Sequence, residues 1–178
     1  MVGKRIVVLG ATGSGKTTLS KQLARRLSLA YIEMDALFWL PGWKEKPLKD
    51  FMGDLKAAMA AAPDGWVADG GYLTQIGSLT LDAADTIVWL ALPFHITYRR
   101  MAVRTLRELF TRELMWGTNR ASFQREFLSR RSILLFAFRQ RTAHFTRYRP
   151  ILESADFRDK VLTLRTPKEV TALVSSFL

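Results

Sequence analysis

The feature that most constrains this chain is the segment GATGSGKT, from Gly10 to Thr17. It fits the pattern G-x-x-x-x-G-K-[ST] in full, follows the apolar run RIVVLG and precedes KTTLSKQLARRL, whose leucines recur every fourth residue. A glycine-rich turn between a strand and a helix directs backbone N–H groups at phosphate oxygens, and the helix N-terminus adds a positive dipole end. The pattern therefore predicts a nucleotide-binding loop rather than a glycine-rich turn of chance composition.

Within this loop, Lys16 is predicted to reach the β- and γ-phosphates, and the Thr17 hydroxyl to ligate Mg²⁺. No convincing run of four apolar residues ending in aspartate is present, and the guanine-reading motif N-K-x-D is missing. These absences favour a small kinase over a hydrolytic switch or a mechanical ATPase. The residues expected to contact ATP are Gly10, Ala11, Thr12, Gly13, Ser14, Gly15, Lys16, Thr17 and Thr18.

Apolar strand segments alternate with helical segments along the chain. The five predicted strands are RIVVLG, AYIEMD, GWVADGG, DTIVWLAL and KVLTLR. Helices are expected after Lys16, after Pro47, from Pro93 to about Phe110, over 122–145, and at the end, where Thr166 and Glu169 form a capping box. This alternation predicts an α/β fold: a five-stranded parallel sheet with helices on both faces.

Length and composition fit one domain over 1–178. The chain has no cysteine, which excludes disulfides and thiolate metal sites, and no apolar run approaches membrane-spanning length. We therefore expect a cytoplasmic protein with no membrane contact. The net charge of +11 is concentrated in 96–150, which holds thirteen arginines, three glutamates and no lysine. Such a local arginine field attracts anions.

Several distinctive segments follow one another along the chain: VVLGATGSGKTTLSKQLARRL, MDALFWLPGW, WVADGGY, AADTIVWLALP, TRELMWG, FQREFL and LRTPKEV. In this order they resemble bacterial DNA topology modulation proteins, which are adenylate-kinase-like P-loop proteins. The resemblance implies a nucleoside-monophosphate-kinase fold, ATP, Mg²⁺ and a mobile arginine-rich lid, here at about 111–121. Unlike adenylate kinases, this chain has no arginine between Arg26 and Arg99 to hold an acceptor phosphate. Lysine is not an equivalent of a bidentate arginine, so a hydroxylated metabolite is favoured over a nucleoside monophosphate.

The acceptor side is expected at the carboxyl ends of the second and third strands. Asp35, at the end of the second strand, is predicted to orient an acceptor hydroxyl and take its proton, although aspartate is also a common helix cap. Asp69, at the end of the third strand, resembles the adenylate-kinase aspartate that holds Mg²⁺ through water, but Asp-Gly is also common in turns. Trp39, Trp43 and Tyr72 are predicted to contact the acceptor.

Phosphoryl transfer needs positive charge around the transferred group. Arg104, Arg112 and Arg141 are the predicted catalytic arginines, because they lie on a helical stripe, in the lid and on an apolar helix face respectively. The leading hypothesis is therefore an ATP-dependent phosphotransferase acting on a small molecule. Two alternatives remain: an ATP-binding, DNA-associated regulator that contacts nucleic acid through 96–150, and a nucleotide-binding regulator with no acceptor.

Overall fold

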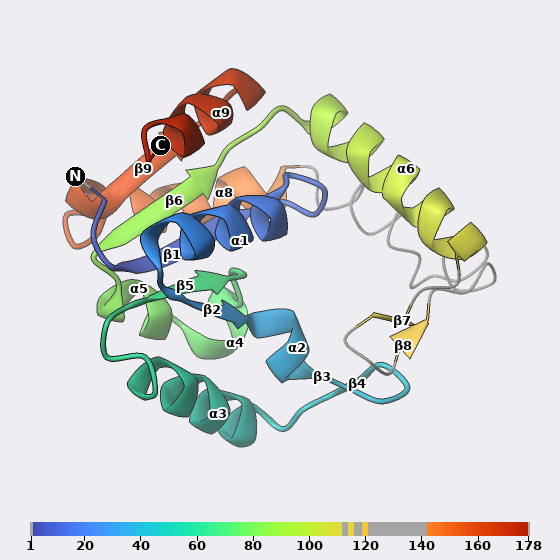
Figure 1. Cartoon of the computed structure of the whole chain (residues 1–178), viewed down its shortest axis with the longest axis horizontal. Helices are drawn as coiled ribbons and strands as arrows, with labels where there is room; N and C mark the ends of the chain where they lie inside the picture. Colours follow the sequence, from blue (N-terminus) through green and yellow to red (C-terminus); the bar gives the residue numbers. More distant parts are fainter. Residues whose placement is uncertain (1, 112–113, 116–118, 121–141, 178) are drawn as a thin grey trace.

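The computed structural model describes residues 2–111, 114–115, 119–120 and 142–177. Five parallel strands form the central sheet in the order β2-β5-β1-β6-β9. Their bounds are β1 Arg5–Gly10, β2 Ala30–Glu33, β5 Trp66–Asp69, β6 Thr86–Leu90 and β9 Val161–Leu164. The predicted parallel α/β sheet is thus confirmed, with all five strands in the expected segments (Figure 1).

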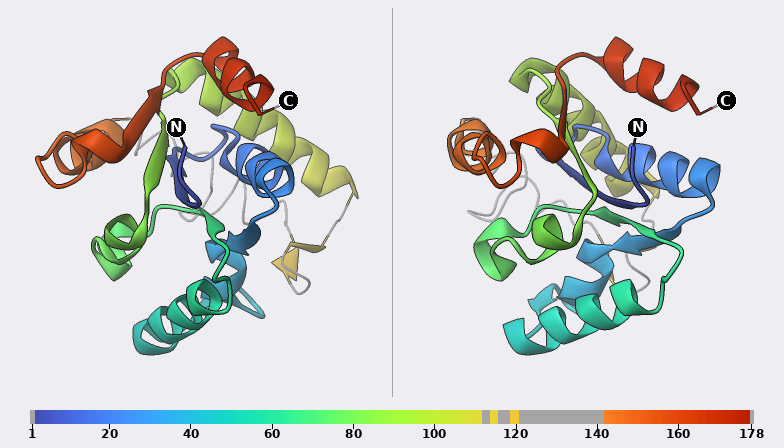
Figure 2. Two further views of the ribbon diagram at one scale, coloured as in Figure 1. Left: turned by 60° about the vertical axis from the view of Figure 1, so that its left-hand side comes forward. Right: turned by 90° about the vertical axis from the view of Figure 1, so that its left-hand side faces the viewer.

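Helices cover both faces of this sheet, as its two views in Figure 2 show. On one face α1 (Lys16–Leu27) and α9 (Pro167–Ser175) bury Leu19, Leu23 and Val174 against the alternate strand residues. The other face is covered by short and long helices together. These are α2 Met34–Phe38, α3 Leu48–Ala60, α4 Leu73–Ile76, α5 Leu79–Ala83 and α8 Ala143–Leu152. Burial of both strand faces explains why the strands read as continuous apolar runs.

The remaining elements lie outside these two layers. A two-stranded ribbon of β3 (Trp39–Leu40) and β4 (Lys44–Glu45) follows α2. The long helix α6 (Phe94–Thr111) begins directly after Pro93, as predicted. A second ribbon, β7 (Leu114–Met115) with β8 (Asn119–Arg120), lies within the predicted lid, and the 3₁₀ turn Arg158–Lys160 precedes β9. Most of the helix predicted over 122–145 falls outside the described residues.

One sequence expectation is corrected by this fold. Asp35 does not end the second strand, because β2 stops at Glu33 and Asp35 lies in the first turn of α2. The physical reason is that Met34 and Phe38 are both buried while Ala36, between them, is exposed. One helical turn allows this, whereas an extended strand would put all three side chains on the same face. The side chain of Asp35 is not engaged as an N-cap, since Glu33 occupies that position without a side-chain capping bond.

Helix ends carry the signals expected from the sequence. In α9 the Thr166 hydroxyl accepts a hydrogen bond from the Glu169 N–H at 3.2 Å, and Pro167 occupies the first turn. Glu169 in return accepts from the backbone N–H of Arg165 at 2.6 Å. In the described part of the chain, no helix is long and apolar enough to cross a membrane.

Candidate active site at the carboxyl ends of β1, β2 and β5

The loop between β1 and α1 is shaped by glycines at positions that exclude other side chains. Gly13 and Gly15 have φ of 80° and 94°, in the left-handed region. A Cβ on Gly13 would lie 2.2 Å from the carbonyl oxygen of Thr97 on α6, so this loop packs directly against that helix. The loop geometry therefore depends on the glycine spacing that defined the motif.

This loop leaves groups that suit a phosphate ligand. The N-terminus of α1 has no side-chain cap and no acidic residue in its first turn, so its N–H groups remain available as donors. The Ser14 hydroxyl is buried and has no hydrogen-bond partner among the described residues. Both observations fit a bound polyphosphate in the place the sequence predicts. Thr17 and Thr18 are exposed on the first turn of the helix.

Lys16 interacts electrostatically with charged residues from three other segments of the chain. Its ammonium group donates to the Ala11 carbonyl oxygen at 3.2 Å, so the side chain folds back over its own loop. Burial lowers the pKa of Lys16, while the negative charges of Asp69 and Asp35 act in the opposite direction and Arg104 adds to the lowering. Three predicted site residues from three separate segments are thus close enough to Lys16 to influence its charge.

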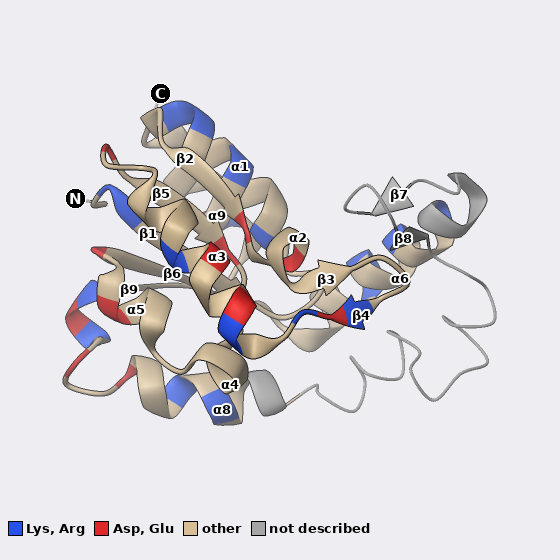
Figure 3. Cartoon of the chain, turned by 90° about the horizontal axis from the view of Figure 1, so that it is seen from below, with Lys and Arg blue, Asp and Glu red and all other residues tan. Residues whose placement is uncertain are grey.

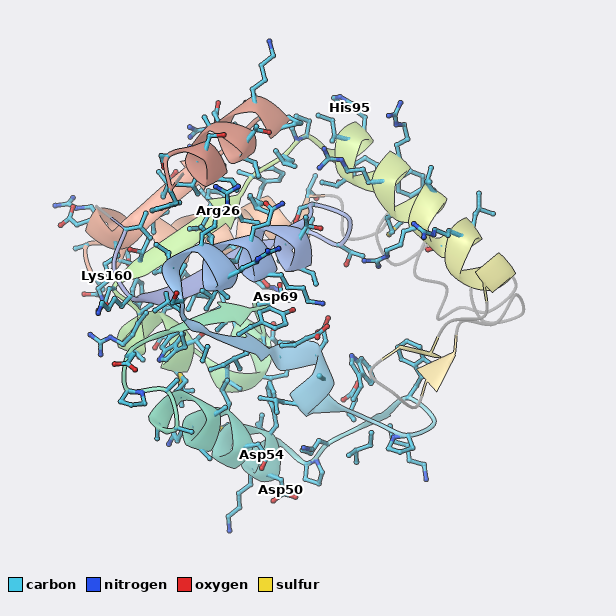
Figure 4. All side chains as sticks on the ribbon, viewed as in Figure 1. Arg26, Asp50, Asp54, Asp69, His95 and Lys160 are labelled. Carbon is cyan, nitrogen blue, oxygen red and sulfur yellow. The ribbon has the colours of Figure 1, made fainter. Side chains whose placement is uncertain are left out.

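Asp69 is buried at the end of β5, between α1 and α2 in Figure 4. Its Oδ2 accepts a hydrogen bond from the Tyr31 hydroxyl at 3.1 Å, whereas Oδ1 has no hydrogen-bond partner among the described residues. Burial and Asp69 raise the pKa of Tyr31, so this hydroxyl keeps its proton at neutral pH. The free carboxylate oxygen and the Thr17 hydroxyl fit Mg²⁺, which takes one or two protein oxygens together with phosphates.

Asp35 is half-buried in the first turn of α2, and its carboxylate is bound by Tyr72, which follows β5. The Tyr72 hydroxyl donates to Asp35 Oδ1 at 2.5 Å, and its ring packs against Phe38 and Phe51. Burial and the charge of Asp35 raise the pKa of Tyr72 well above its usual range. Phe38 is buried, as expected for a core residue, and its ring also contacts Trp39.

The two tryptophans belong to the β3–β4 ribbon that follows α2: Trp39 begins β3, and Trp43 directly precedes β4. The rings of Trp39 and Trp43 meet edge to face with centroids 5.8 Å apart, and both side chains are partly exposed. Trp43 has φ of 59°, which is unusual for a bulky residue and follows Gly42, also at positive φ. The sequence signal for this ribbon was the Pro41-Gly42 dipeptide, a turn marker that the sequence reading left unused.

The arginines are only partly described. Arg104 is exposed on α6, and basic residues are visible along that helix in Figure 3, whereas acidic residues occur at the end of β2 and on α2. Arg112 and Arg141 lie outside the described residues, as does most of the predicted lid, so their roles stay predictions. One contact that the sequence reading missed is that of Arg147 on α8, which donates to the Thr74 hydroxyl at 3.0 Å.

The fold and the loop together define the class of small P-loop kinase folds, and comparisons with known proteins agree. No family model matches the chain. Over 143 residues it is 27% identical to the shikimate kinase of Mycobacterium avium, covering 73% of this chain and 77% of that protein. The shikimate kinase of Mycolicibacterium paratuberculosis matches at the same identity and coverage.

Solved structures of low sequence identity share the fold. The shikimate kinase from Acinetobacter baumannii, in complex with shikimate, has a TM-score of 0.57 at 16% identity and covers 97% of this chain and 89% of its own. A gluconokinase from Sinorhizobium meliloti 1021 gives 0.51 at 17% identity, covering 98% and 89%. The deoxyadenosine kinase from M. mycoides, with bound dCTP, gives 0.52 at 9% identity and covers 97% of each chain. The relationship to DNA topology modulation proteins stays a prediction.

Proposed function

We propose that the protein is a small ATP-dependent kinase that transfers the γ-phosphoryl group to a hydroxyl of a small molecule. The observation that supports this best is the joint placement near Lys16 of Asp69, at the end of β5, and Asp35, in the first turn of α2 just after the neighbouring strand β2. The named relatives are kinases of shikimate, gluconate and deoxyadenosine, all of which carry hydroxyl groups. A proton acceptor close to the phosphate loop is what a hydroxyl acceptor requires.

In the proposed reaction, the acceptor oxygen attacks the γ-phosphorus while its proton passes to Asp35. The bond between the γ-phosphorus and the bridging oxygen breaks, and ADP leaves. Lys16 and the N–H groups of the loop stabilise the charge on the phosphoryl oxygens. Mg²⁺, when bound, neutralises phosphate charge, and Asp69 and Thr17 would hold it. Arg104 is proposed to add positive charge from α6.

The absence of arginine between Arg26 and Arg99 favours a hydroxyl over a phosphate acceptor. The lysines in this interval are Lys44, Lys46, Lys49 and Lys56. Lys46 already pairs with Asp54 on α3, at 2.5 Å. Point charges of this kind do not reproduce the bidentate arginine clamp that a monophosphate needs.

The test is ADP formation from ATP and Mg²⁺ with shikimate, gluconate, deoxyadenosine and AMP as separate acceptors. We expect acceptor-dependent turnover with a hydroxyl compound, its loss in Lys16→Ala, and a fall of about 10² to 10⁴-fold in Asp35→Asn. Asp50→Asn is the matched control, because Asp50 is an exposed carboxylate on α3.

Two results would contradict the proposal. One is full activity of Asp35→Asn on a hydroxyl acceptor, which would remove the proton-accepting role. The other is binding of ATP that does not depend on Lys16. Transfer to AMP that survives Asp35→Asn would instead indicate a phosphate acceptor, since a phosphate oxygen needs no base. Salt-sensitive DNA binding without turnover, unchanged in Lys16→Ala, would favour the nucleic-acid alternative.

A further inference from the structure

Two tyrosines hold the two site carboxylates in a reciprocal arrangement across neighbouring strands. Tyr31 belongs to β2 but donates to Asp69, at the end of β5. Tyr72 follows β5 but donates to Asp35, which follows β2. Strand β2 and the helix after it thus supply Tyr31 and Asp35, and strand β5 and the loop after it supply Asp69 and Tyr72. Each tyrosine binds the carboxylate of the other segment.

The two pairs lie on opposite faces of the sheet. In the parallel register of β2 and β5, Glu33 is opposite Asp69, so Tyr31 is its diagonal neighbour on the same face. That face is covered by α1, since Tyr31 packs with the cluster that contains Leu19 and Leu23. Tyr72 packs instead with Phe38 and Phe51 on the face covered by α2 and α3. One pair thus lies toward the phosphate loop and the other toward the Trp39–Trp43 ribbon.

Tyr72 has an unusual backbone conformation, and its ring has aromatic contacts on the face covered by α2 and α3. Its φ of 29° is outside the usual range for a side chain of this size. Such strain persists only when surrounding contacts over-determine the conformation, and it concentrates at functional sites. Here the ring has two aromatic neighbours, Phe38 at 4.8 Å and Phe51 at 5.1 Å between centroids. A side-chain hydrogen bond from Trp39 also reaches its hydroxyl.

Each tyrosine occupies a single oxygen of its carboxylate. Tyr31 binds Oδ2 of Asp69 and leaves the buried Oδ1 without a hydrogen-bond partner among the described residues. Tyr72 binds Oδ1 of Asp35. A phenol, with an ordinary pKa of about 10, is neutral at pH 7 and is a good donor to a carboxylate.

We propose that Tyr31 and Tyr72 are positioning residues that divide the work of the two carboxylates. Tyr31 holds Asp69 with one oxygen directed to the nucleotide and its metal, and Tyr72 holds Asp35 for the acceptor hydroxyl. This inference rests on the proposed function. It predicts that removing one hydroxyl affects only one half of the reaction, nucleotide binding or acceptor phosphorylation, although Tyr31 lies on β2 and Tyr72 follows the adjacent strand β5.

The first test measures the pairing without any acceptor. Melting temperatures are compared for Tyr31→Phe with Asp69→Asn, and for Tyr72→Phe with Asp35→Asn, as singles and doubles. We expect each matched pair to depart from additivity by about 2 to 6 °C. The crossed doubles, Tyr31→Phe with Asp35→Asn and Tyr72→Phe with Asp69→Asn, are the controls and should be additive within about 1 °C. If the melting-temperature changes of the matched pairs are additive, the tyrosines do not position the carboxylates and the proposal is wrong.

The second test separates positioning from structural support. Calorimetry of ATP binding with and without Mg²⁺ should show a loss of about 10 to 100-fold in the Mg²⁺-dependent affinity for Tyr31→Phe, the size typical of residues that support metal ligands. Tyr72→Phe should bind ATP·Mg²⁺ as the unmodified protein does. With a hydroxyl acceptor that is phosphorylated, Tyr72→Phe should lower kcat about 10 to 100-fold with little change in KM.

Equal effects of the two substitutions on Mg²⁺-dependent binding would overturn the division of roles. The outcome stays separate from that of the proposed function. If none of the four acceptors is phosphorylated by the unmodified protein, the kinase proposal loses its support. The melting cycles and the binding of ATP·Mg²⁺ still decide whether the tyrosines position the carboxylates.

Discussion

At the scale of single residues, Asp85 links the ionisation of one side chain to folding. Its carboxylate accepts from the Arg5 backbone N–H at 3.0 Å and from the Arg5 guanidinium, which joins the start of β1 to the start of β6. These hydrogen bonds and the positive charge of Arg5 hold the pKa of Asp85 below its usual value. A depressed carboxyl pKa stabilises the folded state above the unfolded pKa of about 3.9 and ceases to do so as the pH falls through the folded pKa.

Asp85→Asn is therefore expected to lower the free energy of unfolding at pH 7. The difference from the unmodified protein should shrink as the pH falls below about 4, where Asp85 is protonated first in the unfolded state, and should be lost once the pH passes below the lower folded-state pKa. Urea unfolding between pH 2.5 and 7 measures this. Asp159→Asn is the control, because that carboxylate is highly exposed and its contact with Arg158 is long, at 3.7 Å. A constant difference across the whole pH range would contradict the prediction.

At the scale of elements, two glycines around α3 have opposite roles. Gly65, in the turn before β5, has φ of 123°, and a Cβ there would lie 2.4 Å from the Lys4 carbonyl oxygen. Gly53, inside α3, has no atom within 4 Å of the same position. Gly65→Ala should destabilise the protein by about 1 to 3 kcal/mol through strain. Gly53→Ala should stabilise it by about 0.5 to 1 kcal/mol, as alanine is the better helix former. Urea unfolding of both variants gives the comparison, and destabilisation by Gly53→Ala would show that α3 needs this glycine.

Among the described elements, the sequence predicted the five strands of the central sheet and the helices α1, α3, α6 and α9, but not the short helices or the bounds of α8. Strands such as Thr86–Leu90 are uniformly buried, so their apolar runs are unambiguous. By contrast, Met34 and Asp35, the first two residues of α2, were predicted to end a strand, because α2 spans little more than one helical turn. The spacing of Met34 and Phe38 fits a helix and a strand alike over so few residues. Likewise α4 and α5 are too short for periodicity to show.

In the candidate site too, the features that are local in sequence were predictable and those that depend on long-range packing were not. The phosphate loop was predictable because its glycines, Lys16 and Thr17 are local in sequence. The placement of Asp35 and Asp69 near the loop followed from the rule that parallel strands present their carboxyl ends at one edge. The pairing of Tyr31 with Asp69 was not predictable, because it depends on which strands are neighbours and in what register. Strand order and register are properties of long-range packing, and the sequence of a single strand does not determine them.

At the scale of the whole molecule, the described arginines of α6 are exposed, and Figure 3 shows basic residues along this helix and acidic residues at the end of β2 and on α2. Arg104 of this helix is close enough to Lys16 to contribute to the lowering of its pKa. Many of the thirteen arginines in 96–150, Arg112 and Arg141 among them, lie outside the described residues. Contact with nucleic acid through this segment therefore stays a prediction.

Binding of ATP should stabilise the whole fold, because its proposed site is the loop between the central strand β1 and helix α1. A ligand at a hundred times its Kd adds about 2.7 kcal/mol to the free energy of unfolding. For a chain of this length that corresponds to a rise in Tm of about 5 to 10 °C. Thermal unfolding monitored by tryptophan fluorescence, with ATP and Mg²⁺ titrated in, measures the shift.

Lys16→Ala should show a much smaller rise at the same ATP concentration. Lys21→Ala is the matched control: Lys21 lies farther along α1 with its ammonium group over the Tyr31 ring, and the nucleotide-dependent rise should be retained. An equal rise in Lys16→Ala would mean that ATP stabilises the protein from a place other than this loop.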